Sequence, residues 1–351
     1  MLEQLTNRDY RRIAICVFIS VISLIIVQKY FTEVFPDASI KMDVTKDEAH
    51  IIAEKFLANR GHDVEGYMHA HRFGWLDDAK EFLEFELPAD SAGTILNNTN
   101  SYYWGNRWFI PEKEEEYFVK ISTTGNIAEF DHTINEDAVG DSLSKERAIY
   151  IAEFFLVGSI GIDINNWELV ESKLEKQKNR WDHRLEWKEK SFNINESTHR
   201  ITILVQGGNV DYYKEWIKVP DTWKREYEKL RSKNGLLGSI GSFGFILTIF
   251  LIFLMIFIRS RKNDIRWKTA LIYSLIAGTI MLLMQLNELP LQMYGFDNKD
   301  SFSSFVTQVI LIQCILIPLG IGLFFSVLIA GSEPLYRDQY PHHISFRHIL
   351  T

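Results

Sequence analysis

The sequence predicts a multi-pass α-helical membrane protein with four spans and an α+β domain held outside the cell. Three observations support this prediction. Apolar residues are concentrated in four long runs, charged residues lie mostly between the runs, and the segment Thr45–Leu57 is repeated at Ser144–Leu156. The mean hydropathy of −0.08 is therefore an average over the apolar runs and the charged segments between them.

Each apolar run is long enough to cross a membrane, which takes roughly 17–25 mainly apolar residues. The runs are Ile13–Phe31, Ile240–Ile258, Thr269–Leu286 and Phe305–Ala330. The fourth is the longest, and its Pro318 is expected to kink it. No run has an ionisable residue in its core, where such a group would cost about 2.5–3.5 kcal/mol and mark a pathway or catalytic group. This argues against an ion-coupled transporter and against catalysis within these four helices.

Basic flanking residues predict the orientation, because cytoplasmic loops are enriched in Lys and Arg. Residues 1–12 contain three arginines, and the connection 259–268 contains five basic residues. The connection 287–304 has one Lys and three acidic residues. We therefore expect the N-terminus and the tail, 331–351, in the cytoplasm and residues 36–235 outside. The alternative for the first run is a cleaved signal peptide, but no small-residue cleavage site follows it, so we expect a retained anchor.

The segment between the first two runs is acidic. Residues 36–235 contain 37 Asp and Glu against 26 Lys and Arg, a net charge of −11. This balance argues against nucleic acid as a partner, because phosphate binding needs a basic face. Both cysteines, Cys16 and Cys314, lie in apolar runs, so the domain has no disulfide framework and must fold on its hydrophobic core.

An internal repeat organises this domain. Thr45–Leu57 and Ser144–Leu156 are identical at seven of thirteen positions. Each copy is expected to form a helix that begins after the Thr or Ser cap, with Glu48 completing a capping box in the first copy. Gly61 and Gly161 are expected to end the two helical elements. The domain therefore divides into a first repeat, 36–134, and a second, 135–235.

Strand-like segments with alternating apolar residues follow each helix. In the first repeat they are Tyr103–Ile110, Glu116–Ser122 and Asn126–His132, and in the second they are Trp167–Leu174, Arg184–Lys188, Thr198–Val205 and Val210–Val219. Asp77–Leu87 and Asp221–Lys233 are expected to be helical. Each repeat is thus predicted to be a helix packed on an antiparallel sheet. This helix-then-hairpin order resembles the PepSY-type modules of bacterial envelope proteins.

Histidines are the candidate metal ligands. His69 and His71 are two residues apart, so on a strand they would share a face and could hold a metal ion. No third ligand is evident nearby, and surface histidines are the simpler interpretation. A second cluster, His342, His343 and His348, lies in the tail, where a solvated segment is the simpler interpretation. We therefore predict no metal ligand.

Two further clusters could serve binding. An aromatic cluster could line a peptide or glycan groove or pack in the core of the sheet; it comprises Tyr102, Tyr103, Trp104, Trp108 and Phe109. The acidic run Glu112–Glu116 is most simply a solvated loop before a strand. We predict no catalytic and no cofactor-binding residue in this chain.

Several separated segments of the second half agree in order with one known family. They are Asn179–Trp187, Ile217–Trp223, Arg225–Asn234, Asp264–Trp267, Leu289–Gly295 and Glu333–Arg337. From Lys178 onward the chain resembles the N-terminal half of long-form bacterial CPBP-family (CAAX-protease-like) intramembrane proteases. The resemblance implies a membrane or envelope protein as substrate. In such an enzyme the catalytic half follows the region seen here, and a divalent metal would belong to that catalytic half.

The active-site motifs of that family have no counterpart here. Its enzymes carry Glu-Glu-x-x-x-Arg, Phe-x-x-x-His and His-x-x-x-Asn or Asp on membrane helices. The nearest segment, Glu115–Lys120, ends in Lys and lies on a predicted strand. No Phe lies four residues before a His, and no Asn or Asp lies four after one. No catalytic residue can therefore be transferred to this chain.

Two functions remain from the sequence. The first is the membrane-anchoring and substrate-selecting or regulatory portion of an intramembrane protease, inactive by itself. The alternative is a membrane-tethered sensing or binding module without enzymatic activity. Tyr336–Thr351 has neither a closing cap nor a basic stop, which favours the first and predicts that the reading frame continues.

Overall fold

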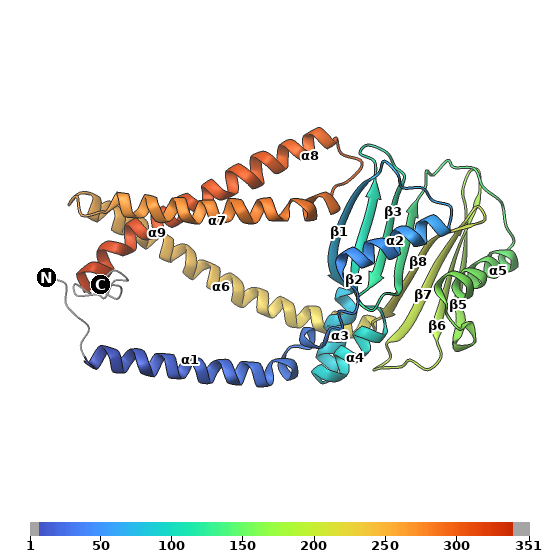
Figure 1. Ribbon diagram of the computed structural model, residues 1–351, viewed down its shortest axis with the longest axis horizontal. Helices are drawn as coiled ribbons and strands as arrows, with labels where there is room; N and C mark the ends of the chain where they lie inside the picture. Colours follow the sequence, from blue (N-terminus) through green and yellow to red (C-terminus); the bar gives the residue numbers. More distant parts are fainter. Residues whose placement is uncertain (1–6, 340–351) are drawn as a thin grey trace. The chain divides into compact units, whose positions relative to one another are not determined.

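A computed structural model describes residues 7–339, and these residues form two compact units. The sheet unit comprises residues 31–226 and 290–305. The helical unit comprises residues 7–30, 227–289 and 306–339. Their helices and strands are labelled in Figure 1.

The sheet unit contains one antiparallel sheet of eight strands, in the order β1-β2-β3-β4-β8-β7-β6-β5. The strands are β1 (Met68–Trp75), β2 (Tyr102–Phe109), β3 (Glu116–Ser122), β4 (Ile127–Thr133), β5 (Trp167–Lys176), β6 (Trp181–Glu189), β7 (Thr198–Gln206) and β8 (Asn209–Lys218). The prediction of one sheet for each repeat is wrong in one respect. Each repeat contributes four strands to a single sheet, because β4 pairs with β8 across the repeat boundary. The sequence analysis also missed β1 as a strand.

Two helices at equivalent places in the repeats cover the same face of this sheet (Figure 1). They are α2 (Lys46–Asn59) and α5 (Lys145–Phe155). The predicted capping box is present, since Thr45 accepts from Glu48 N and the Glu48 side chain accepts from Thr45 N. Ser144 caps α5. Gly61 and Gly161 adopt positive φ angles of 81° and 84°, a conformation that glycine adopts without steric cost.

One hydrophobic core lies between these helices and the sheet. It combines Ala53 and Phe56 of α2 and Ala152 of α5 with strand residues of both repeats, such as Val119 and Ile203. The two repeats therefore share a core as well as a sheet. A second core cluster contains Phe82 of α3 (Asp77–Glu86) and Leu96 of α4 (Ala89–Asn98), and sequence analysis expected the first of these helices but not the second. The short helices η1 (Pro36–Ser39), η2 (Leu156–Ile160) and η3 (Ile164–Asn166) complete the unit.

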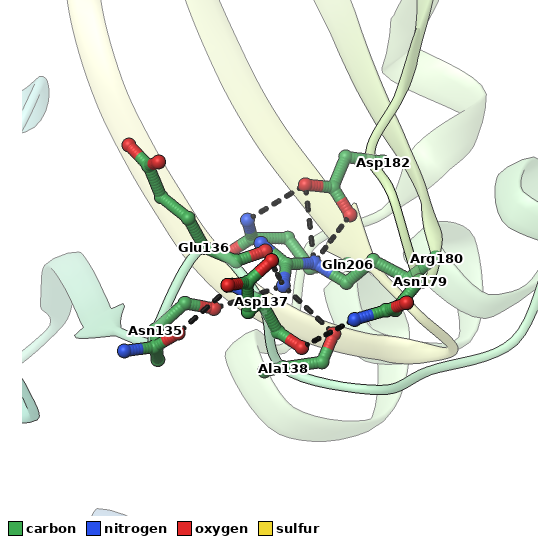
Figure 2. Close-up of polar contacts among 8 residues, drawn as sticks. All are labelled: Asn135, Glu136, Asp137, Ala138, Asn179, Arg180, Asp182 and Gln206. Carbon is green, nitrogen blue, oxygen red and sulfur yellow. Dashed lines mark hydrogen bonds and ion pairs between the residues drawn. The ribbon is translucent and has the colours of Figure 1, made fainter.

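A buried arginine fastens residues 135–138, which follow β4 and are here called the linker between the repeats, to the start of β6 (Figure 2). Arg180 Nε donates to Asp182 Oδ1 at 3.0 Å, and Gln206 donates to the same carboxylate at 3.1 Å. Arg180 Nη1 donates to the backbone carbonyls of Asn135, Glu136 and Ala138 at 2.9–3.0 Å. Arg180 and Asp182 are 4% and 3% exposed. Their charges are therefore compensated by each other and by the linker backbone rather than by water.

The helical unit contains four helical segments that are long and apolar enough to cross a membrane. They are α1 (Asn7–Val34), α6 (Asp221–Ser260), α7 (Trp267–Tyr294) and the continuous run of α8 (Phe302–Gln308), η4 (Val309–Leu316) and α9 (Ile317–Gln339). Each contains one of the predicted spans. The η4 segment is π-helical and ends just before Pro318. Pro318 has no N–H to offer the carbonyl of Cys314, which explains an irregular segment at this point.

Small residues bring α7 and α9 close together within the helical unit. A Cβ on Gly278 would lie 3.1 Å from the Pro318 carbonyl oxygen. Ser274 Oγ donates to the Gly322 carbonyl at 2.6 Å. Close backbone approach at small residues and hydrogen bonds between helices are typical of membrane helix pairs.

We predict that Arg180→Ala lowers the free energy of unfolding by about 3 kcal/mol, because it leaves the buried Asp182 carboxylate without its cation. Urea unfolding of the detergent-solubilised chain, followed by tryptophan fluorescence, measures the change. Lys178→Ala is the control, since the neighbouring pair of Lys178 and Asp137 is exposed and should contribute less than about 1 kcal/mol. Equal effects of the two substitutions would contradict the role assigned to Arg180.

Candidate functional site

The face of the sheet opposite α2 and α5 carries a row of charged side chains. Val119 and Ile121 of β3 point into the core, so Lys120 between them points to the second face. Lys120 is paired with Glu129 of β4, and Glu129 is paired with Lys214 of β8. Glu129 Oε2 lies 2.8 Å from Lys120 Nζ and 3.5 Å from Lys214 Nζ. One carboxylate thus lies between two ammonium groups from different repeats.

A second row runs beside the first. Asp131 of β4 is paired with Tyr212 of β8, Tyr212 with Leu204 of β7, and Leu204 with Arg184 of β6. Arg184 is exposed, and no acidic side chain among residues 7–339 lies within ion-pair distance of its guanidinium. The second row therefore ends in a cation without an ion pair, with which the Glu171 carboxylate of β5 interacts only at longer range.

These rows form the floor of a pocket of about 480 Å³, here called the sheet pocket. Its walls come from the end of β1, the start of α3, and strands of both repeats. The lining residues are Trp75, Leu76, Asp77, Asp78, Ala79, Tyr103, Lys120, Arg184, Thr202, Tyr212, Lys214, Trp216 and Ile217. The pocket combines three basic side chains and four aromatic ones with the two carboxylates Asp77 and Asp78 at its α3 end, and it exists only because the two repeats share one sheet.

Burial and neighbouring charges shift the ionisation of the pocket floor. Burial raises the pKa of Asp131 to about 6, and the nearby Glu129 and Glu116 carboxylates act in the same direction. Burial opposes the charged form of Lys120, but the attraction of Glu129 outweighs it and raises the Lys120 pKa. Lys120 therefore stays protonated at neutral pH. Its ammonium lies 4.7 Å from the centre of the Tyr103 ring, a cation–π contact.

The segment 290–305, which comprises the end of α7, the connection to α8 and the start of α8, packs on the sheet. Arg107 of β2 is 3% exposed and donates through Nη1 to the carbonyls of Tyr294, at 2.9 Å, and Phe296. Its Nε donates to Glu116 of β3 at 2.9 Å. Asn298 donates to the same carboxylate at 3.1 Å. A buried ion pair of the sheet thus holds the backbone of a segment that is distant in the sequence.

Aromatic contacts complete the packing of this segment. Phe296 and Tyr294 form a buried cluster with Phe109 of β2 and Ala70 of β1. A Cβ on Gly105 would lie 2.5 Å from Tyr294 Oη, so glycine is required where the tyrosine crosses β2. Gly105 is paired with Lys120 of the sheet pocket. The segment therefore lies directly beside the pocket floor.

A third histidine, which was not predicted from the sequence, lies beside the histidine pair of β1. The ring of His50, on α2, lies 4.1 Å from His69, which lies 5.5 Å from His71. Burial lowers the pKa of His69 to about 4, so its ring is neutral at neutral pH, and His69 Nε2 lies 3.1 Å from Asn106 Oδ1. Among residues 7–339, no group of three or more His, Cys, Asp or Glu side chains has a geometry that could hold a metal ion. The tail histidines His342, His343 and His348 lie outside the described residues.

The predictions for the acidic run and for the aromatic cluster agree with the structure only in part. Glu116 is not simply solvated, because it pairs with Arg107, and Glu115 Oε1 lies 3.1 Å from His132 Nε2. Four of the five aromatic residues contribute to the core clusters: Tyr102, Trp104, Trp108 and Phe109. Tyr103 alone of the five lines the sheet pocket. Glu115–Lys120, the segment nearest to the protease motif, leads into and lies along β3, as expected.

Sequence analysis did not find the basic residues of the sheet pocket. Lys120, Arg184 and Lys214 lie on three separate strands, and no local spacing connects them. The alternation of Tyr212, Lys214 and Trp216 in β8 does indicate a polar and aromatic face. Which strand lies next to that face depends on the β4–β8 pairing, which leaves no local pattern.

Comparisons with known proteins give one distant structural similarity. No family model and no curated relative matches the chain. The C-terminal domain of Bacillus megaterium YpeB aligns with a TM-score of 0.32 and 14% sequence identity. The alignment covers 49% of this chain and 63% of that domain, less than two thirds of its length. At this TM-score the similarity does not establish a common fold.

The stability of the sheet unit should depend on pH through His199 of β7. The His199 ring lies 2.7 Å from Glu189 Oε2 and 2.8 Å from Glu215 Oε1. Burial lowers its pKa, but the contacts with Glu189 and Glu215 outweigh burial and raise it to about 9. The unfolded value is about 6.5. The folded state therefore binds this proton more tightly, and the stabilisation is complete below about pH 6.5 and lost as pH rises through about 9.

We expect His199→Gln to lower the free energy of unfolding by about 2 kcal/mol at pH 6 and to reduce the decrease between pH 6.5 and 9. Urea unfolding at several pH values measures both effects. His71→Gln, at a half-buried position of β1, is the control and should keep the pH dependence of the unmodified chain. An unchanged pH profile in His199→Gln would show that His199 is not the group responsible.

Proposed function

We propose that this chain is a membrane-anchored binding protein whose sheet unit lies outside the cytoplasm and holds a segment of another protein in the sheet pocket. The observation that carries the proposal is the pocket itself. It combines three basic and four aromatic side chains from both repeats, and it measures about 480 Å³, within the range of ordinary ligand sites.

The packing of segment 290–305 supports the predicted membrane topology. The sheet lies between the first and second predicted spans, and segment 290–305 lies between the third and fourth. In a four-span chain these two connections must lie on the same side of the membrane. The hydrogen bonds from Arg107 to Tyr294 and Phe296 require the same arrangement.

The basic flanks support the assignment of that side as extracytoplasmic. Residues 259–268 contain five basic residues, and a cluster of ion pairs occupies this end of the helical unit. Arg259 lies 2.9 Å from Asp264, and Arg337 lies 2.7 Å from the same carboxylate. A surplus of Lys and Arg is typical of the cytoplasmic ends of membrane helices.

In this proposal the chain selects substrates rather than cleaving them. Its resemblance to the N-terminal half of CPBP-type proteases, and weakly to PepSY-type modules, favours a role beside a catalytic bundle, where a divalent metal would belong. The sheet pocket would hold a membrane or envelope protein, and this chain by itself would be inactive. Without a catalytic partner, the same pocket would serve as a membrane-tethered sensing module.

Cysteine labelling tests the orientation. In a chain with Cys16→Ala and Cys314→Ala, Lys173→Cys on β5 should react with a membrane-impermeant thiol reagent on intact cells. The Lys173 side chain is 72% exposed, so access is not limiting. Lys262→Cys, in the connection between α6 and α7, should react only after the cells are opened. The reverse pattern would place the sheet unit in the cytoplasm.

Photo-crosslinking in cells tests the binding function. A photoreactive phenylalanine at Trp75, which is 43% exposed at the sheet pocket, should form adducts with a segment of an extracytoplasmic protein. The matched control is the same group at Tyr150 of α5, which is 58% exposed and lies outside the pocket. The expected adduct forms at Trp75 and is absent at Tyr150. No adduct at Trp75, or the same adducts at both positions, would contradict the proposed function.

A further inference from the structure

We propose that the sheet pocket recognises an acidic segment of a polypeptide, in which a carboxylate lies next to an aromatic or aliphatic side chain. This inference rests on the proposed binding function and adds the chemical class of the ligand. It also assigns Arg184 as the residue that determines specificity.

The first reason for an acidic ligand is that the guanidinium of Arg184 has no ion-pair partner. Three other arginines of the sheet unit are paired with carboxylates: Arg107 with Glu116, Arg180 with Asp182 and Arg200 with Glu186. Arg184 is exposed in the sheet pocket, and no acidic side chain of residues 7–339 lies within ion-pair distance. A guanidinium binds a carboxylate through two parallel hydrogen bonds, so its preferred ligand is planar and anionic.

The second reason for an acidic ligand is the contrast between the basic side chains of the pocket and the negative net charge of the domain around it. Residues 36–235 have a net charge of −11, yet the pocket lining carries Lys120, Lys214 and Arg184 against two carboxylates, Asp77 and Asp78, and Glu129 lies between the two lysines. A concave basic site in an acidic surface concentrates the field and attracts anions to that site. At the α3 end, Asp78 is paired with Lys224, so the positive charge is strongest at the β6–β8 end. The ligand carboxylate is therefore expected near Arg184.

The aromatic walls supply the second half of the recognition. Trp75 is exposed, and Trp216 is held by its Nε1, which donates to Thr202 Oγ1 at 3.0 Å. Tyr103 is fixed by the cation–π contact with Lys120. Indole and phenol rings held in one orientation offer apolar contact area at a low cost in conformational entropy. A side chain next to the ligand carboxylate can pack on them while Arg184 binds the charge.

Peptide selection tests this inference. The full chain in lipid nanodiscs is exposed to a pool of random heptapeptides, acetylated and amidated so that every carboxylate belongs to a side chain. Retained peptides should be enriched in Asp or Glu next to an aromatic or aliphatic residue. Arg184→Gln should weaken the binding of a selected acidic peptide about ten-fold, the effect of losing one charge-assisted hydrogen-bonded pair. The Asn or Gln counterpart of that peptide should be affected less than about two-fold.

Matched variants separate recognition from a structural effect. Lys188→Gln removes a cation four residues further along the same face of β6, outside the pocket, and should leave peptide binding unchanged. Arg184→Lys should retain part of the acidic preference, because the charge remains but the planar fork is lost. An equal loss for acidic and neutral peptides in Arg184→Gln would overturn the assignment of Arg184.

The remaining outcomes distinguish this inference from the function on which it rests. If retained peptides show no acidic preference while the Trp75 adduct forms in cells, the ligand class is wrong and the binding function stands. If the Trp75 adduct is also missing, the binding function fails as well. If inorganic phosphate displaces the acidic peptides at equal concentration, the site binds free anions, and the assignment to a polypeptide is overturned.

Discussion

The sheet unit depends on the pairing of β4 with β8. Only Glu129, Phe130 and Asp131 on one strand meet Tyr212, Tyr213 and Lys214 on the other. This short contact joins two repeats that would otherwise each leave a sheet edge open, and an open edge exposes unpaired backbone groups. Phe130 and Tyr213 place the same contact in the shared core. On the other face it brings Lys120, Glu129 and Lys214 into one row. The sheet pocket therefore depends on the same strand pairing as the fold.

Two buried arginines extend this arrangement. Arg180 holds the linker between the repeats, and Arg107 holds the segment between α7 and α8. Each guanidinium pairs with one carboxylate and uses its remaining donors on backbone carbonyls. A guanidinium suits this task because its five donors are fixed in one plane, whereas an ammonium offers only a point charge. The two arginines thus hold parts of the chain that are distant in sequence against the sheet. The charge of each arginine is compensated by its carboxylate partner.

Segment 290–305 lies beside the floor of the sheet pocket. It includes the end of α7 and the start of α8, and Tyr294 lies over Gly105, the cross-strand neighbour of Lys120. The pocket floor and the docked segment therefore share one strand pair.

The sequence by itself determined the elements with local causes: the four apolar helices, the capping box of α2, the serine cap of α5, the glycine ends of the helices and most strands. It also shows that the cores of the four apolar runs contain no ionisable residue. It missed β1, because His69, Arg72 and Gly74 give that strand a weak pattern, and it missed α4. Only the tertiary structure decided that two repeats make one sheet, that His50 lies beside His69, and that Arg107 holds Tyr294. The physical reason is that hydrophobic periodicity records which face of an element is buried, whereas the partner of that face is chosen by packing across long sequence separations, which leaves no local pattern.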